Sequence, residues 1–186
     1  MAKKLNEEFR KDPLNFLLKY NLSVVDGVMR TGPQRVGFSA DQERVLLRRF
    51  DGEPNRNDNP LDIYFLLALP DAENHALNFG QTDRNYFFTS TLSGCQVLIY
   101  GPDKKNLSIQ HNNDLKGVGE YERYFAKIPE NNINVRVHNG GMYDITQDDI
   151  GNIVGVRNES GWNFYFQKIQ RDQHSNKKTR SVTKLT

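Results

Sequence analysis

Two short apolar runs that flank a tight turn constrain this chain more than any other feature. Residues 96–100 are rich in β-branched and aromatic side chains, and residues 106–111 alternate between polar and apolar ones. Both patterns predict strands. The Gly-Pro-Asp-Lys-Lys sequence between them, residues 101–105, is typical of a turn. The stretch is therefore predicted to fold as a β-hairpin around Asp103.

The apolar residues of the two runs select the register of this hairpin. If Val97 faces Ile109, the only cysteine of the chain, Cys95, faces His111 on the same side. Directly opposed side chains have Cβ atoms about 5 Å apart. A slip of two residues would keep the thiol and the imidazole on this face, whereas a slip of one residue would separate them.

A thiol beside an imidazole has the chemistry of a nucleophile with its base. A free cysteine titrates near pH 8.5, and a histidine within hydrogen-bond reach can take its proton. Gly94 permits an unusual backbone at the turn that enters the strand, and the turn Ser93 to Cys95 is placed to aim N–H groups at an oxyanion. Thr89 offers a hydroxyl or a carbonyl that could orient the imidazole. Together these residues match the logic of a catalytic triad.

The residues alone leave a structural role for this cysteine open. A lone cysteine in an apolar stretch is usually a small buried hydrophobe, and a histidine at a strand end is often only a polar edge residue. Three more histidines, His75, His138 and His174, are present in the chain. None of them has so direct a local route to Cys95.

Residues 87–97 also carry a resemblance to a known family. Phe87-Phe88-Thr89 followed by Leu92-Ser93-Gly94-Cys95 resembles the active-site segment of the Burkholderia lethal factor-like glutamine deamidase toxins. Leu-Ser-Gly-Cys is also similar to the catalytic motif of the cytotoxic necrotizing factors. The resemblance implies that Cys95 is the nucleophile, His111 the base and Thr89 the residue that holds the histidine. The interval from cysteine to histidine is longer than in the lethal factor and closer to that of the necrotizing factors.

The resemblance implies a function as well as a site. It implies a virulence factor that converts a glutamine of a host protein to glutamate, without a metal or a cofactor. The implied target is the helicase subunit of eukaryotic translation initiation factor 4, whose modification would block translation. Two alternatives stay open: deamidation or transglutamination of a Rho-family GTPase, and a non-catalytic β-rich interaction domain with a structural cysteine.

Length predicts one domain over residues 1–186, which the resemblance implies is catalytic, and the strand and helix patterns predict class α+β. We expect a β-sandwich-like core of two mixed sheets, edged by a few helices and long loops, as the resemblance also implies. One cysteine excludes an intrachain disulfide, which suits a reducing cytosol. No apolar run has the length of a membrane span, and the N-terminus has no apolar signal region. We therefore expect no membrane contact and no conventional signal peptide. The resemblance implies a monomer that is made in the bacterial cytoplasm and acts in the host cytoplasm.

Charge is concentrated at the C-terminal end. Residues 171–186 contain five basic residues and one acid, so this segment carries +4 while the rest of the chain carries −2. A charged tail is usually solvated, and the domain itself has no basic footprint. The sequence therefore predicts a basic tail and no direct binding of nucleic acid.

Helix and strand patterns fill the remaining sequence. Residues 4–20 are predicted to be helical, with Asp12 as N-cap and Pro13 as the first helical residue and an interruption. A turn is predicted at residues 39–41 and a second helix at residues 119–128. Strands are predicted at residues 24–25, 28–29, 35–38, 44–48, 61–69, 134–138, 151–157 and 162–169, the last with Trp162, Phe164 and Phe166 on one core face.

Overall fold

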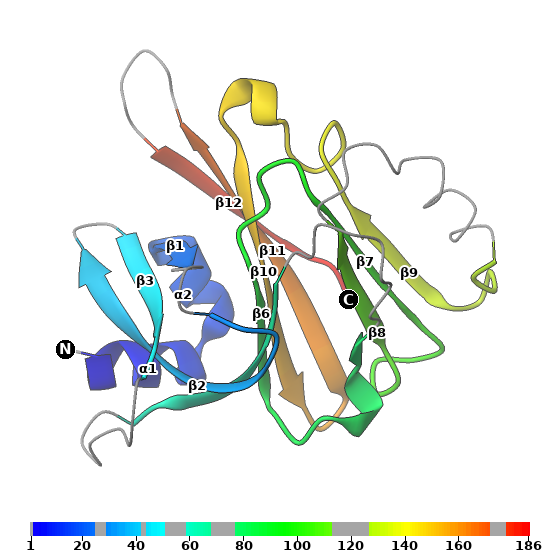
Figure 1. Cartoon of the computed structure of the whole chain (residues 1–186), viewed down its shortest axis with the longest axis horizontal. Coiled ribbons are helices and arrows are strands. Elements are labelled where there is room, and N and C mark those ends of the chain that lie inside the picture. Colours follow the sequence, from blue (N-terminus) through cyan, green and yellow to red (C-terminus); the bar gives the residue numbers. More distant parts are fainter. Residues whose placement is uncertain are drawn as a thin grey trace.

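The computed structural model in Figure 1 describes residues 2–24, 29–41, 44–50, 59–67, 77–112, 127–171 and 178–186. It contains one large sheet of mixed direction and one small antiparallel sheet. The predicted class, α+β with mostly strands, is confirmed. The predicted pair of mixed sheets is wrong in detail, because the small sheet is purely antiparallel and the large one curls until it is nearly closed, like a barrel.

The large sheet has eight strands. Only two neighbouring pairs, β1 with β3 and β4 with β6, run parallel. Its order is β1 (Asn21–Val24), β3 (Arg44–Arg49), β2 (Gly32–Asp41), β4 (Leu61–Leu66), β6 (Tyr86–Thr89), β10 (Ile150–Asn158), β11 (Gly161–Arg171) and β12 (Lys178–Lys184).

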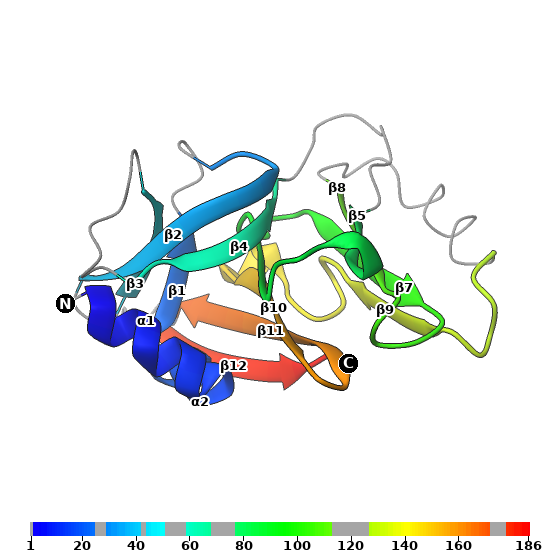
Figure 2. The same cartoon turned by 90° about the horizontal axis from the view of Figure 1, so that it is seen from below.

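The small sheet has four strands, in the order β5 (Leu77–Asn78), β8 (Ser108–Asn112), β7 (Gln96–Gly101) and β9 (Ile133–Val137). Two 3₁₀ turns, η2 (Phe79–Gln81) and η3 (Ile145–Gln147), lie in the connections. Figure 2 shows this sheet on one side of β10 and β11, and the helices on the other.

Proline divides the predicted N-terminal helix into two. Helix α1 spans Ala2–Lys11 and α2 spans Pro13–Lys19. The Asp12 side chain accepts a hydrogen bond from the Asn15 N–H at 3.0 Å, which is the expected N-cap. Among the described residues, no helix is long and apolar enough to cross a membrane.

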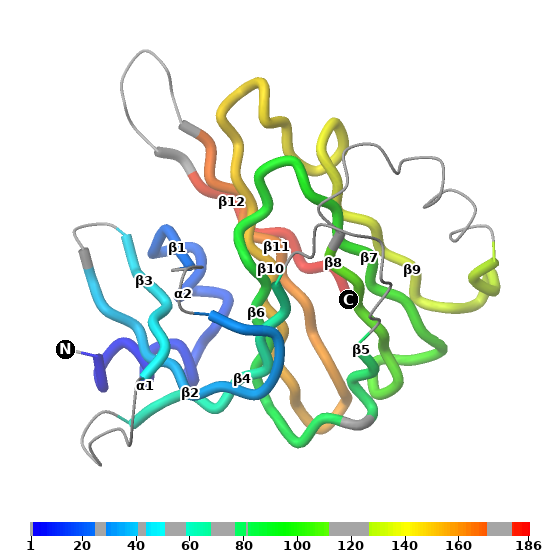
Figure 3. Tube along the Cα trace, viewed as in Figure 1, coloured from blue at the N-terminus to red at the C-terminus, as the bar shows by residue number. Residues whose placement is uncertain are grey.

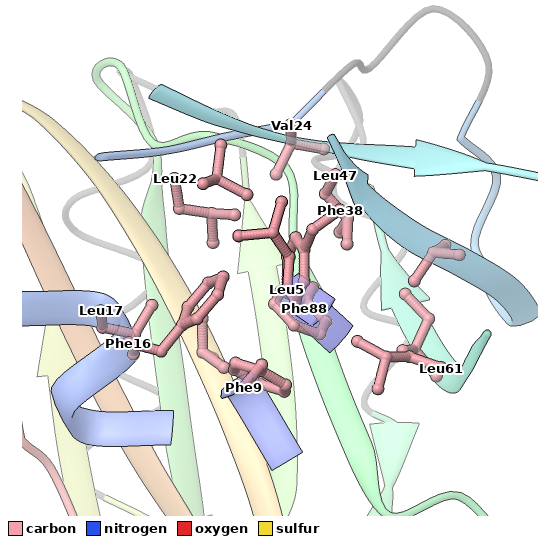
Figure 4. Packing of buried hydrophobic residues seen from close by; sticks show 14 of the residues in the cluster. Leu5, Phe9, Phe16, Leu17, Leu22, Val24, Phe38, Leu47, Leu61 and Phe88 are labelled. Atoms are coloured by element: carbon pink, nitrogen blue, oxygen red, sulfur yellow. The ribbon is translucent and has the colours of Figure 1, made fainter. Parts of the chain in front are cut away.

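One hydrophobic core lies between the helices and the inner face of the curled sheet (Figure 4). Phe9 of α1 packs edge-on against Phe16 of α2 and against Phe38 of β2, with ring centroids 5.3 Å apart in each pair. Phe88 of β6 joins the same cluster. Such aromatic edge contacts contribute to stability beyond the area that they bury.

A second core lies between the two sheets. Trp162, Phe164 and Phe166 of β11 pack there against apolar residues of the small sheet, among them Val97 and Ile99. All five side chains are almost fully buried. The predicted core face of the last hairpin is therefore confirmed.

The predicted basic tail is not a tail. Residues 178–184 form β12, which pairs antiparallel with β11 from Arg171 opposite Lys178 to Tyr165 opposite Lys184. Its backbone groups are satisfied by this ladder, and Val182 packs on the first core. Pairing with β11 and the packing of Val182 therefore give this basic segment a fixed strand structure.

The remaining local predictions are in part wrong, in part confirmed, and in part outside the described residues. The prediction of a turn at residues 39–41 is wrong, because Ser39 to Asp41 continue β2 and pair with β3. Of the strands predicted at 24–25 and 28–29, Val24 pairs in parallel with Leu47 and Met29 is not in a strand, while residues 25–28 lie outside the described ones. Residues 119–126 of the helix predicted at 119–128 also lie outside the described residues. The strands predicted at 35–38, 44–48, 61–69, 134–138, 151–157 and 162–169 are confirmed within two or three residues at their ends.

Side-chain amides bridge the remaining gap of the curled sheet. Gln167 of β11 accepts a hydrogen bond from the Leu22 N–H at 3.0 Å and donates to the carbonyls of Leu17 and Tyr20. Asn152, directly opposite Gln167 on β10, donates to the Leu22 carbonyl at 2.9 Å. Both amides are almost fully buried. They therefore hold α2 and β1 against β10 and β11, which no backbone ladder between the described strands does.

We expect Gln167→Leu to lower the free energy of unfolding by about 2–4 kcal/mol, because one backbone N–H and two carbonyls lose their partner in a buried place. Urea unfolding measures the loss. Gln170→Leu on the same strand is the matched control, since the Gln170 amide only reaches the exposed Gln147 side chain. Equal losses in the two variants would contradict the bridging role of Gln167.

Candidate active site

The segment between β6 and β7 crosses from the large sheet to the small one and carries the cysteine (Figure 3). Leu92 is anchored to Gly151 of β10 by two backbone hydrogen bonds of 2.7 and 3.0 Å. The Thr91 hydroxyl donates to the Asn152 side chain at 3.2 Å. Gly94 has a φ of 108°, a backbone conformation that glycine adopts readily and other residues rarely do. The chain is therefore fixed at residues 91 and 92, where it enters the turn before Cys95.

The β7–β8 hairpin is confirmed, but its register differs from the prediction by two residues. His111 lies opposite Val97, and Ile109 lies opposite Ile99. The turn is wider than expected, because the Asp103 carboxylate accepts the N–H groups of Lys105 and Asn106 and keeps these residues out of the ladder. A slip of two residues preserves the face of every side chain.

Cys95 and His111 consequently share the face between the sheets. They are diagonal rather than direct neighbours, because Cys95 lies two residues before Val97, the partner of His111. Diagonal neighbours on one face of an antiparallel pair are about 7–8 Å apart. Cys95 packs in the core between the sheets and is 4% exposed, and His111 is 7% exposed.

Thr89 faces the same core from the large sheet. Along β6, Phe87 belongs to the core between the sheets and Phe88 to the core under the helices, so Thr89 points to the same side as Phe87. Thr89 pairs with Leu66 of β4, whose carbonyl lies close to the His111 ring. The thiol, the imidazole and the hydroxyl thus come from three elements and face one shared core.

The expected hydrogen bond from the Thr89 hydroxyl to the imidazole is not formed. Among the described residues, the buried Thr89 hydroxyl has no hydrogen-bond partner, and the buried ring nitrogens of His111 have no well-formed hydrogen bond, with only the Leu66 carbonyl acting on the ring. Buried polar atoms are nearly always paired in native proteins, so each unpaired one calls for an explanation. These atoms face the same core as Cys95 and mark this end of the core as a candidate active site.

Burial makes the His111 imidazole neutral. Desolvation lowers the pKa of His111 from 6.5 to about 4, and the nearby Leu66 carbonyl opposes this shift only in part. A neutral imidazole has the lone pair that a general base needs. Formation of a thiolate beside it would raise the pKa of His111, because an opposite charge favours the protonated ring.

Tyr143 is a residue of this site that the sequence did not indicate. Its hydroxyl donates a hydrogen bond to the Cys95 carbonyl and accepts one from the Gly94 N–H at 3.3 Å. The Gly94 N–H, expected to face an oxyanion, therefore already has a partner, while Ser93 is exposed. Tyr143 lies far from Cys95 in the sequence, and its only local signal is an aromatic ring after the Gly140-Gly141 turn.

The other candidates stay apart from this site. His138 is half-buried and its Nδ1 lies 2.7 Å from the Asn139 carbonyl, and His75 and His174 lie outside the described residues. Asp149 is buried and pairs with Lys168 at 3.1 Å. The described part of the chain contains no group of three or more histidine, cysteine, aspartate or glutamate residues that could hold a metal ion.

No protein-family model matches the chain, and no curated protein matches it either. The resemblance of residues 87–97 to the deamidase toxins therefore rests on that short segment alone.

The buried imidazole should make the protein less stable in acid. A histidine whose pKa is about 4 when folded and 6.5 when unfolded contributes stability that is fully present above pH 6.5 and is lost as the pH falls towards 4. The loss at pH 4.5 relative to pH 7.5 is about 2–3 kcal/mol from His111 alone. Urea unfolding at the two pH values measures it.

The control for this acid loss removes the titrating group. His111→Gln should lose less stability than the wild type between pH 7.5 and 4.5, since carboxylate titration is common to both proteins. His138→Gln, at a half-buried histidine, should behave like the wild type. An acid loss in His111→Gln as large as in the wild type would show that His111 is not the buried group that titrates.

Proposed function

We propose that the protein is a protein-glutamine deamidase with Cys95 as nucleophile and His111 as base. The observation that supports this proposal best is the common placement of the thiol, the imidazole and the Thr89 hydroxyl on the core between the sheets. The ring nitrogens of His111 and the hydroxyl of Thr89 form no regular hydrogen bond, so they are available for proton transfer and for orienting the ring. The match of the surrounding residues to the deamidase toxins supports the same assignment.

The reaction proceeds through a thioester. His111 takes the Cys95 proton, and the sulfur attacks the carbon of a glutamine carboxamide. N–H groups of the turn at Gly94 and Cys95 stabilise the tetrahedral oxyanion, and for this the Gly94 N–H exchanges its hydrogen bond to the Tyr143 hydroxyl for one to the oxyanion. His111 then returns the proton to the departing nitrogen, and ammonia leaves. A water molecule, deprotonated by the same imidazole, cleaves the thioester to give glutamate and the free thiol. These steps require no metal and no cofactor.

Thr89 acts on the imidazole in this scheme. Its hydroxyl faces the same core as the His111 ring, and both lie against Leu66. An imidazolium formed during the reaction has two N–H donors, and a hydroxyl oxygen can accept one of them. Thr89 would thereby select the ring orientation in which the other nitrogen serves the sulfur.

The proposed substrate is a host protein. The resemblance to the lethal factor-like toxins points to the helicase subunit of translation initiation factor 4, reached in the host cytoplasm. The necrotizing factors point instead to Rho-family GTPases, and there an amine could replace water in the last step and give transglutamination. Both routes pass through the same Cys95 thioester.

A non-catalytic interaction domain is the second candidate, and the depth of the site favours it. Cys95 is 4% exposed and His111 is neutral, as for two residues that only fill a core. In this reading Cys95 contributes packing alone, and the unpaired polar atoms lower the stability of the fold without serving a reaction.

Cys95→Ser separates the two candidates. The exchange of sulfur for oxygen changes little volume but removes the easily ionised nucleophile, so the variant should melt within a few degrees of the wild type. It should fail to inhibit translation in a eukaryotic lysate. Mass spectrometry of the treated lysate should show no conversion of glutamine to glutamate in the initiation-factor helicase.

Two further variants complete this experiment. His111→Ala should also be inactive, whereas His138→Ala should retain full activity. Equal inhibition by the wild type and Cys95→Ser would favour the interaction domain. Absence of inhibition by the wild type would exclude the assigned target, and a proteome-wide search for glutamines converted to glutamate would then name another or exclude the reaction.

A further inference from the structure

The loop from Asn139 to Asp149 brings one aromatic side chain to the turn that carries the cysteine. Within this loop, the Gly140 N–H donates to the Tyr143 carbonyl at 2.9 Å. The Tyr143 ring is 2% exposed and lies beside Phe166, with centroids 6.1 Å apart. The position of Tyr143 is therefore set by its own backbone and by the core between the sheets.

A partly buried ion pair anchors the far end of the same loop. The Asp149 carboxylate accepts the Asp144 N–H at 3.0 Å and binds the Lys168 ammonium at 3.1 Å. Lys168 belongs to β11, so the loop is fastened to the large sheet one residue after Tyr143. A loop held in this way can present a side chain with little freedom.

The Tyr143 hydroxyl bridges the two peptide groups that flank Gly94 and Cys95. It accepts from the Gly94 N–H at 3.3 Å and donates to the Cys95 carbonyl. One oxygen atom thus restrains the backbone torsions of Gly94, where φ is 108°, and of Cys95. These torsions decide where the Cys95 sulfur points.

The same hydroxyl stays protonated and lies within electrostatic range of the sulfur. Burial raises the pKa of the Tyr143 phenol, and a charge on Cys95 raises this pKa further. The coupling is mutual: a neutral O–H dipole beside Cys95 can support a thiolate, whereas a phenolate would oppose it.

We infer that Tyr143 is a positioning residue for the Cys95 thiol. The Tyr143 hydroxyl orients this thiol through its hydrogen bonds with the Gly94 N–H and the Cys95 carbonyl. A role of Tyr143 in catalysis rests on the proposed deamidase function. The reactivity of the thiol, however, can be measured without any turnover.

Tyr143→Phe removes the hydroxyl and keeps the ring. The probe is iodoacetamide, with the rate of Cys95 alkylation measured as a function of pH. At pH 7 the variant should react about tenfold more slowly than the wild type, because the sulfur loses its fixed direction and the nearby neutral O–H dipole. The midpoint of the pH profile should move to higher pH, while the plateau at high pH stays within about threefold of the wild type.

Tyr20→Phe is the matched control. Its hydroxyl also donates a hydrogen bond, to Glu8 at 3.2 Å, but it lies by the helices. This variant should keep the alkylation profile of the wild type. An unchanged midpoint and rate in Tyr143→Phe would overturn the inference and leave Tyr143 a packing role only.

A second measurement covers the case in which Tyr143→Phe does not fold cooperatively. In the wild type, hydrogen exchange followed by NMR should show the Gly94 amide at least about tenfold slower than the amide of the exposed Ser93, relative to their unfolded rates. Equal protection of the two amides would overturn the inference. A wild type that converts no glutamine would exclude the deamidase but leave both of these results interpretable.

Discussion

The three hydrogen bonds of the Gln167 amide are the interaction on which the rest of this structure depends. An open sheet of eight strands would leave β1 with a row of unpaired backbone groups, which is a hazard for aggregation. Gln167 satisfies the Leu22 N–H and the carbonyls of Leu17 and Tyr20 from across the gap. The curled sheet can thereby enclose the aromatic core under the helices without a complete ladder of backbone hydrogen bonds around it.

The closure of the sheet and the candidate active site share a residue. Asn152 stands opposite Gln167, donates to the Leu22 carbonyl and accepts from the Thr91 hydroxyl, two residues after the end of β6. One side of the cysteine segment is thus fixed by the element that closes the sheet, and the other by Tyr143. A site with two such supports can hold a nucleophile in one direction, as covalent catalysis needs.

Local sequence patterns predict much of this fold and part of its site. Alternation identified the strands, and the aromatic face of β11 was placed in the core correctly, because burial of apolar residues governs both. The predicted register of the hairpin is wrong by two residues. The Asp103 carboxylate widens the turn, and matching apolar residues across the strands does not reveal this. The even slip kept Cys95 and His111 on one face. Tyr143 and Gln167 could not be predicted, because each acts on backbone groups distant in the sequence through a polar side-chain atom.

The span of the Gln167 bridge has a consequence for the order of folding. It joins positions 145 and 150 residues apart, whereas β10 and β11 meet through a hairpin of adjacent residues. Contacts between distant positions form late, because the entropy of a long loop must be overcome first. In this order the N-terminal helices dock last, on a β10–β11 hairpin that has already formed. The sheet would then reach its nearly closed shape only in the last step of folding, when the N-terminal helices dock.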